Sequence, residues 1–231
     1  MRRADLVGAL FVLAAVGCSS TPPDRGHTVR CGASNQQRRL PLVYAEDFDT
    51  AASLEGFTFT DSDAWRWHDS GALELAASSE YEPPHRSPRS IAWIDDLTVG
   101  DFVLEATLVQ TGREYGHRDL CLFFGHSSSA RYYYVHLATT PDENANNVFL
   151  VADAPRTNLA PVPESGVAWG TNQPHRVRIE RMLEAGTIRV FFDDMQTPVL
   201  EARDATHGVG RIGFGSFDDT GRFDEVRVWG E

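Results

Sequence analysis

From residue 42 onward the chain is built of short runs in which apolar and polar residues alternate. In the run at 102–108, Phe102, Leu104, Ala106 and Leu108 would share one face of a strand, because successive strand side chains point to opposite faces. Turn-forming sequences such as EAGT at 184–187 separate these runs. No long segment in this region has a helical period. The pattern predicts an all-β fold made of many short strands, such as a sandwich or a barrel.

The N-terminal residues, 1–17, have the layout of a lipoprotein signal peptide. Two arginines precede an apolar run that is too short to span a bilayer as a helix. The ending LAAVGC resembles a bacterial lipobox, which implies cleavage before Cys18 and lipidation of that cysteine. Ordinary secretion is the alternative. We therefore expect an extracytoplasmic protein, lipid-anchored to a bacterial membrane, with a polar tether at 18–41 and one domain at 42–231.

Charge and cysteine content exclude some partners. The formal net charge is −12, and an acidic chain is a poor binder of nucleic acid. Cys31 and Cys121 could pair in an oxidising compartment, or Cys121 could be a small buried residue. The chain has no close cysteine pair and its histidines lack a ligand spacing, so we do not expect zinc.

The sequences DLCLFFGH at 119–126 and RYYYVHLA at 131–138 predict a hairpin across a short polar turn. Tyr132, Tyr134 and His136 would share its outer face. The alternating side chains would join the core: Leu120, Leu122, Phe124, Tyr133, Val135 and Leu137. The polar segment at 78–90 is a candidate rim for that outer face.

Polar and aromatic residues concentrate around this hairpin, and this favours a carbohydrate site. Tyrosine offers a flat apolar ring and one hydroxyl, and histidine, asparagine and aspartate offer directional hydrogen bonds to sugar hydroxyls. The expected ligand-binding residues are Tyr115, Arg118, Asp119, His126, Tyr132, Asn147, Arg156 and Trp169. If the site is catalytic, the expected residues are His136, Tyr134, His117 and Arg113. The alternative is a solvent-facing sheet surface, where tyrosine is favoured anyway.

Three segments resemble the concanavalin A-like superfamily, including its laminin G-like and 3-keto-disaccharide hydrolase-type jelly rolls. They are DFVLEATL at 101–108, QPHRVRIER followed by IRVFFDD at 173–194, and GRIGFGSFDDTGRFDEVRVWG at 210–230. The resemblance covers roughly residues 43–230 and implies a two-sheet antiparallel β-sandwich, a jelly roll, with glycans bound in a concave face. Its motifs concern the fold and say little about chemistry.

The resemblance also suggests a metal. Jelly rolls of this type often hold a structural Ca²⁺ between the first and last strands, bound by oxygen ligands. Glu46, Asp49 and Asp224 are placed for such a site if those strands are neighbours. The alternative is that these are ordinary turn carboxylates in solvent.

Three functions remain open. The first is carbohydrate binding. The second is a polysaccharide-cleaving enzyme, either a β-eliminating lyase or a keto-glycoside hydrolase, which would use the His/Tyr/Arg set. The paired-carboxylate strand motif of family 16 glycoside hydrolases is absent, so that hydrolase class is disfavoured. The third is a structural envelope protein without a small ligand.

Overall fold

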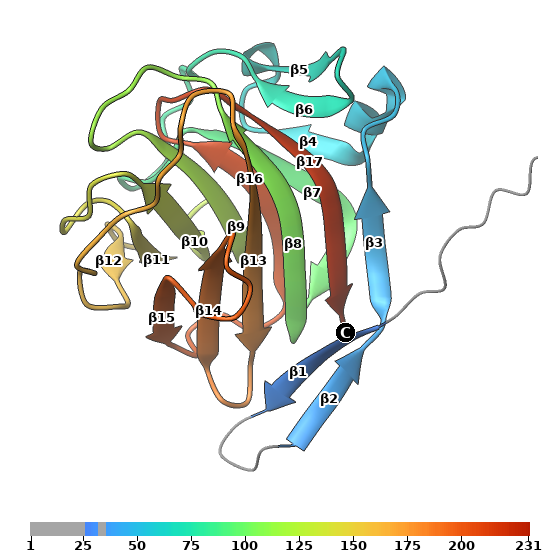
Figure 1. Ribbon diagram of the computed structural model, residues 1–231, viewed down its shortest axis with the longest axis vertical. Coiled ribbons are helices and arrows are strands. Elements are labelled where there is room, and N and C mark those ends of the chain that lie inside the picture. Colours follow the sequence, from blue (N-terminus) through green and yellow to red (C-terminus); the bar gives the residue numbers. More distant parts are fainter. Residues whose placement is uncertain (1–25, 32–35) are drawn as a thin grey trace, which may run out of the picture.

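The computed structural model describes residues 26–31 and 36–231. Within them nearly all regular structure is strand, with two short 3₁₀ helices, η1 (Ala51–Gly56) and η2 (Ser62–Ala64). Two antiparallel sheets pack face to face (Figure 1). The all-β, two-sheet sandwich predicted from the sequence is confirmed. The predicted signal peptide and the predicted lipidation site, Cys18, lie outside the described residues.

Each sheet has a simple order. The first has seven strands: β12 (Thr157–Asn158), β11 (Asn147–Ala152), β10 (Arg131–Ala138), β9 (Asp119–Ser128), β16 (Gly210–Ser216), β7 (Ser90–Val99) and β4 (Phe57–Phe59). The second has eight: β15 (Leu200–Arg203), β14 (Thr187–Phe192), β13 (Pro174–Met182), β8 (Phe102–Gln110), β17 (Gly221–Gly230), β6 (Ala72–Leu75), β5 (Trp65–His68) and, beside β17, β3 (Leu42–Glu46).

The main core fills the space between the sheets. On β8 the alternating residues Phe102, Leu104, Ala106 and Leu108 are buried there, as their period predicts. Burial of one such aliphatic or aromatic side chain stabilises the fold by about 1.5–3 kcal/mol. Because successive strand side chains point to opposite faces, the neighbours of each core-facing residue lie on the outer face of its sheet. A ligand could bind to those outer faces.

A small hairpin precedes the sandwich and was not predicted. Residues expected to be tether form β1 (His27–Cys31) and β2 (Gln36–Leu40), which pair antiparallel and lie at the lower edge of Figure 1. Leu40 is fully buried against Val103 and Met182 on the outer face of the eight-stranded sheet. The ring of His27 lies 5.1 Å from that of Trp229. The sequence does not predict this hairpin because its strands have no apolar period, and its contacts with the sandwich come from single residues such as Leu40 and His27.

Among the described residues, none of the helices has the length and apolar character needed to cross a membrane.

Candidate functional site

Strands β9 and β10 pair as the sequence predicts, with Tyr134 opposite Phe123 and His136 opposite Cys121. Tyr133 and its alternating neighbours are buried in the main core, and Tyr132 and Tyr134 lie on the outer face. That face carries a second buried cluster: Ile91, Trp93, Cys121, Phe123, Tyr132, Tyr134, Phe149 and Val151. The seven-stranded sheet therefore has apolar layers on both faces.

The outer aromatic layer is covered, so its tyrosines do not form an open floor. Tyr132 is 1% exposed and its hydroxyl donates to Ser87 Oγ at 2.7 Å. Tyr134 is fully buried and its hydroxyl accepts from Arg156 Nη1 at 2.7 Å. The expectation that these two rings face a sugar is wrong, because the segment before β7 and the arginine after β11 fold over them.

A hollow of about 190 Å³ opens beside this layer, at the end of the sheet where β9 begins and β10 ends. It lies where side chains from several loops meet those two strands. Its lining is Arg86, Tyr115, His117, Asp119, His136, Asn144, Arg156, Phe217 and Asp218. We call this the His136 pocket. Five of the residues predicted from the sequence are brought together in it: Tyr115, His117, Asp119, His136 and Arg156.

His136 supplies a hydrogen-bond donor at the base of this pocket. Its Nδ1 accepts the backbone N–H of Asn146 at 3.2 Å, so the neutral ring carries its proton on Nε2. Burial, together with the nearby Arg156 charge, lowers the pKa of His136 to about 3. The ring is therefore neutral at physiological pH, and Nε2–H is a fixed donor. A group this weakly basic is poorly matched to proton abstraction near pH 7.

Arg156 is positioned by contacts with four residues. Its guanidinium carbon lies 4.6 Å from the ring centres of both Phe149 and Phe217, within the range of cation–π attraction. Besides the Tyr134 contact, its Nη2 donates to the backbone carbonyl of Asn144 at 3.0 Å. None of the ion pairs found among the described residues involves Arg156. The pocket therefore contains a positioned guanidinium that has no carboxylate within 4.0 Å among the described residues.

Asp119 lines the other side of the pocket, and Asp219, whose carboxylate accepts the backbone N–H of Asp119 at 3.0 Å, lies outside the lining. Asp119 is 1% exposed and accepts from Ser216 Oγ at 3.0 Å. Burial raises the pKa of the Asp119 carboxyl well above its usual value, and the charge of Asp219 raises it further. Burial also raises the pKa of Asp219, although Tyr115 donates its hydroxyl to that carboxylate at 2.7 Å. Asp218 adds an exposed carboxylate to the lining.

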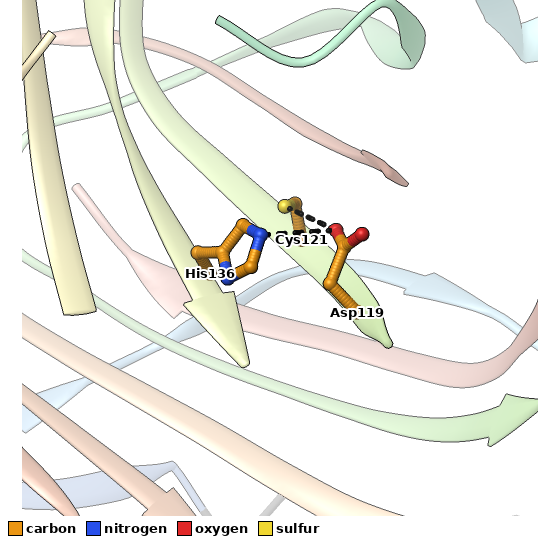
Figure 2. A group of neighbouring side chains, drawn as sticks. All are labelled: Asp119, Cys121 and His136. Carbon is orange, nitrogen blue, oxygen red and sulfur yellow. Dashed lines mark hydrogen bonds and ion pairs between the residues drawn. The ribbon is translucent and has the colours of Figure 1, made fainter. Parts of the chain in front are cut away.

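Asp119, Cys121 and His136 form a compact group at the junction of β9 and β10 (Figure 2). Their ligand atoms lie within 4.8 Å of one another, a separation that could hold a metal ion. The donor set does not fit one. A histidine that binds a metal through Nε2 ordinarily donates its other ring N–H, whereas Nδ1 of His136 faces the N–H of Asn146. We therefore assign no metal to this group, in which Cys121 Sγ donates to Asp119 Oδ2 at 3.1 Å and His136 Nε2 lies 3.7 Å from the same oxygen.

Cys121 is a buried free thiol, so the alternative of a bond to Cys31 is not realised. The Cys31 side chain lies outside the described residues.

His117 pairs with Asp142 at 2.7 Å, and both side chains are partly exposed. Arg113 is exposed and lies over the Tyr115 ring, 4.8 Å from its centre, outside the lining of the pocket.

Three predicted binding residues instead have structural contacts. Trp169 is 1% exposed and its Nε1 donates to the Leu137 carbonyl at 3.1 Å, so it packs mainly in the core. Asn147 is fully buried, with its amide and oxygen bound to backbone groups of Val148 and Ala160. His126 stacks on Trp93 away from the pocket, with ring centres 3.8 Å apart.

The predicted calcium ligands do not converge. The condition that the first and last strands be neighbours is met, because β3 pairs with β17. However, Glu46 Oε1 accepts from the Phe48 backbone N–H and from Ser53 Oγ. The groups of possible metal ligands found among the described residues include neither Glu46, Asp49 nor Asp224. Glu46 ends β3, Asp49 lies just after that strand, and Asp224 lies within β17.

Four lining residues were missed: Arg86, Asn144, Phe217 and Asp218. Arg86 lies in the segment 78–90, which the sequence did indicate as a rim. The others belong to polar or acidic turns whose composition is ordinary for loops. Only the tertiary fold brings them to one place.

Comparisons with known proteins identify the fold. No protein-family model matches the chain, and no curated protein matches it. Among solved structures, the chain is similar to carbohydrate-binding module CBM66 from Bacillus subtilis, with 16% identity over 75% of this chain and 95% of that one, and a TM-score of 0.57. It is similar to a protein of unknown function with a galectin-like fold from Bacillus subtilis, with 14% identity, coverage of 82% and 96%, and a TM-score of 0.56.

A third similar structure is the GH43 protein BlXynB, K247S mutant, from Bacillus licheniformis, with 13% identity and a TM-score of 0.58. The match spans 85% of this chain but 42% of BlXynB. At these identities the likeness concerns architecture. Together with the sheet order, it shows that this chain has a two-sheet antiparallel β-sandwich fold like theirs.

Proposed function

We propose that the protein binds carbohydrate in the His136 pocket. The observation that carries this is the convergence of fixed donors and acceptors on one small hollow. Arg156 and His136 present N–H groups, Asp119 and Asp218 present carboxyl groups, and Phe217 adds an aromatic ring. A sugar hydroxyl both donates and accepts, so it needs such a mixture.

The size and neighbours of the pocket support this. Its volume of about 190 Å³ is below the roughly 300–1,000 Å³ of clefts that hold drug-sized ligands, which favours one sugar unit over a long chain. Of the similar solved structures, one is described as a carbohydrate-binding module. Another, with a TM-score of 0.53, is the carbohydrate recognition domain of Emp46p. A binding role agrees with these descriptions.

The pocket favours binding over β-elimination or keto-glycoside hydrolysis. Tyr134, one candidate acid or base, is fully buried with its hydroxyl bound to Arg156. The weak basicity of His136 makes it a poor proton acceptor. A purely structural envelope role would give no use to the polar groups that converge on this pocket. We further propose that the protein works outside the cytoplasm, lipid-anchored through Cys18, where it would meet glycans.

The test is a binding panel with purified full-length protein. Neutral and uronic-acid polysaccharides are incubated with it, with and without Ca²⁺, and both retention and glycan chain length are measured. Retention without shortening is expected. Arg156→Gln should weaken binding about tenfold or more, because hydrogen bonds to charged groups contribute about 1.5–3 kcal/mol.

The matched control is Arg131→Gln. Arg131 begins β10 of the same sheet and pairs with Asp153, so the variant removes the same charge away from the pocket. It should bind as the wild type does. Equal retention by both variants would contradict the proposed site, and shortening of the glycan that is lost in His136→Ala would make the protein an enzyme.

A further inference from the structure

A second hollow, of about 440 Å³, lies next to the His136 pocket. Loops before β9, after β10 and before β13 meet around it. Its lining is Glu114, Tyr115, Gly116, Arg118, Thr139, Thr140, Ala168, Trp169 and Gly170. Tyr115 lines both hollows, so they are neighbours separated by one side chain. The function proposed above does not use this second hollow.

Arg118 is the unusual residue here. It immediately precedes β9 and is 2% exposed, yet its guanidinium has only long contacts. Nη2 lies 3.4 Å from the Gln110 carbonyl and 3.3 Å from Thr171 Oγ1. Its Nε is buried and has no hydrogen-bond partner among the described residues. A buried cation in such surroundings is costly unless an anion bonds to it.

The nearest carboxylate does not meet that need. Glu114 Oε1 lies 3.8 Å from Arg118 Nη1, beyond hydrogen-bond distance. The Glu114 side chain is 76% exposed and, within the part of the chain that the structure describes, accepts a hydrogen bond only from Thr171 Oγ1, at 3.2 Å. It can therefore move into solvent at little cost. The Glu114 carboxylate therefore lies near Arg118 Nη1 without forming a hydrogen bond to it.

We infer that this hollow is a second binding site, which takes the carboxylate of a sugar acid at the place beside Arg118 where Glu114 now lies. Carboxylates form short, charge-assisted hydrogen bonds with guanidinium groups. The inference that a carboxylate binds here follows from Arg118 alone. The inference that the ligand is a sugar rests on the proposed function, because the sugar would use the adjoining His136 pocket. The ligand class is a uronate, either free or at the end of an oligosaccharide.

Recognition of the carboxylate and recognition of the sugar can be tested separately by calorimetric titration of the full-length protein. The three probes are glucuronate, glucose and acetate. Glucuronate should bind at least tenfold more tightly than glucose. Arg118→Gln should abolish that preference. Glu114→Gln, which removes the competing carboxylate, should tighten glucuronate binding several-fold and leave glucose binding unchanged. Glu143→Gln, at an exposed residue of a nearby loop, is the charge-matched control and should change neither.

Several outcomes would overturn the proposed second site. A wild type that binds glucuronate no better than glucose, or a Glu114→Gln variant with unchanged glucuronate affinity, overturns the site even if Arg118→Gln fails to fold. Acetate binding as tight as glucuronate binding overturns the assignment to a sugar acid. Arg156→Gln should weaken glucose binding about tenfold or more yet leave a glucuronate signal dependent on Arg118, so failure of the first pocket is distinguishable from failure of the second.

Discussion

Glu105 should be the strongest single electrostatic contributor to stability on the outer face of the eight-stranded sheet. Its side chain is 8% exposed and bonds to Arg176, to Arg178 Nε at 2.7 Å and to His27 of the hairpin at 3.3 Å. Burial alone would raise the pKa of Glu105. The hydrogen bonds from His27 and Arg176, with the charge of Arg178, outweigh burial and lower it to about 2.

The size and sign of the effect follow from this shift. A fall from 4.5 to about 2 corresponds to about 3 kcal/mol of folding stability, at about 1.4 kcal/mol for each pH unit. Because the folded-state pKa is the lower one, this stability is fully present above the ordinary pKa. It is lost as the pH falls from about 4.5 through about 2.

Urea denaturation of wild type and Glu105→Gln tests this. The variant should be less stable by about 3 kcal/mol at pH 7 and by about 1.5 kcal/mol at pH 3, where the wild type has already lost part of the contribution. Glu201→Gln, at an exposed residue of β15 in the same sheet, is the control and should change stability by less than about 0.5 kcal/mol. A difference that is the same at both pH values would refute the reasoning.

Three further outcomes are expected. The ring signals of His136 should not titrate between pH 5 and 8 by NMR, since its pKa is about 3; a midpoint near 6.5 would contradict the buried, neutral ring. Leu40→Ala should destabilise the protein by about 2–5 kcal/mol in urea, because Leu40 anchors the hairpin in a fully buried site. A loss below about 0.5 kcal/mol would mean that the hairpin is not docked. Trp169→Ala should cost about 3–5 kcal/mol as a core residue, and an unchanged denaturation midpoint would restore it as an exposed ligand contact.

The pairing of β9 with β10 could be predicted from the sequence because it depends on local rules. A short turn joins two runs, and the side-chain period of two fixes which residues face the core. Tyr133 therefore goes inward and Tyr134 outward, as expected. The same rules cannot show what covers an outer face.

The cover over the tyrosines comes from elsewhere in the chain. Tyr132 bonds to Ser87, which is 45 residues away, and Arg156 reaches back over Phe149 from beyond the end of β11. Both contacts depend on loop conformations that composition does not determine. This is why the expected tyrosine floor is a buried layer, and why Arg156 and His136 present the polar groups instead.

The calcium prediction likewise combined a strand arrangement that is observed with side-chain directions that the sequence does not determine. The prediction required that the first and last strands of the domain be neighbours, and β3 does pair with β17. The direction of each carboxylate did not follow. Glu46 is turned toward Ser53 and Phe48, and Asp224 Oδ1 accepts from the backbone N–H of Glu225. Side-chain direction at strand ends is set by such local hydrogen bonds.

The most direct test of the central claim locates the sugar on the protein. The side-chain N–H of His136 is followed by NMR while the neutral sugar that binds most tightly in the glycan panel is added to saturation. A ligand in the His136 pocket should shift the Nε2–H signal and slow its exchange with solvent, because that proton is the donor offered to the ligand. Saturating binding that leaves the His136 signals unchanged would place the sugar elsewhere and contradict the account.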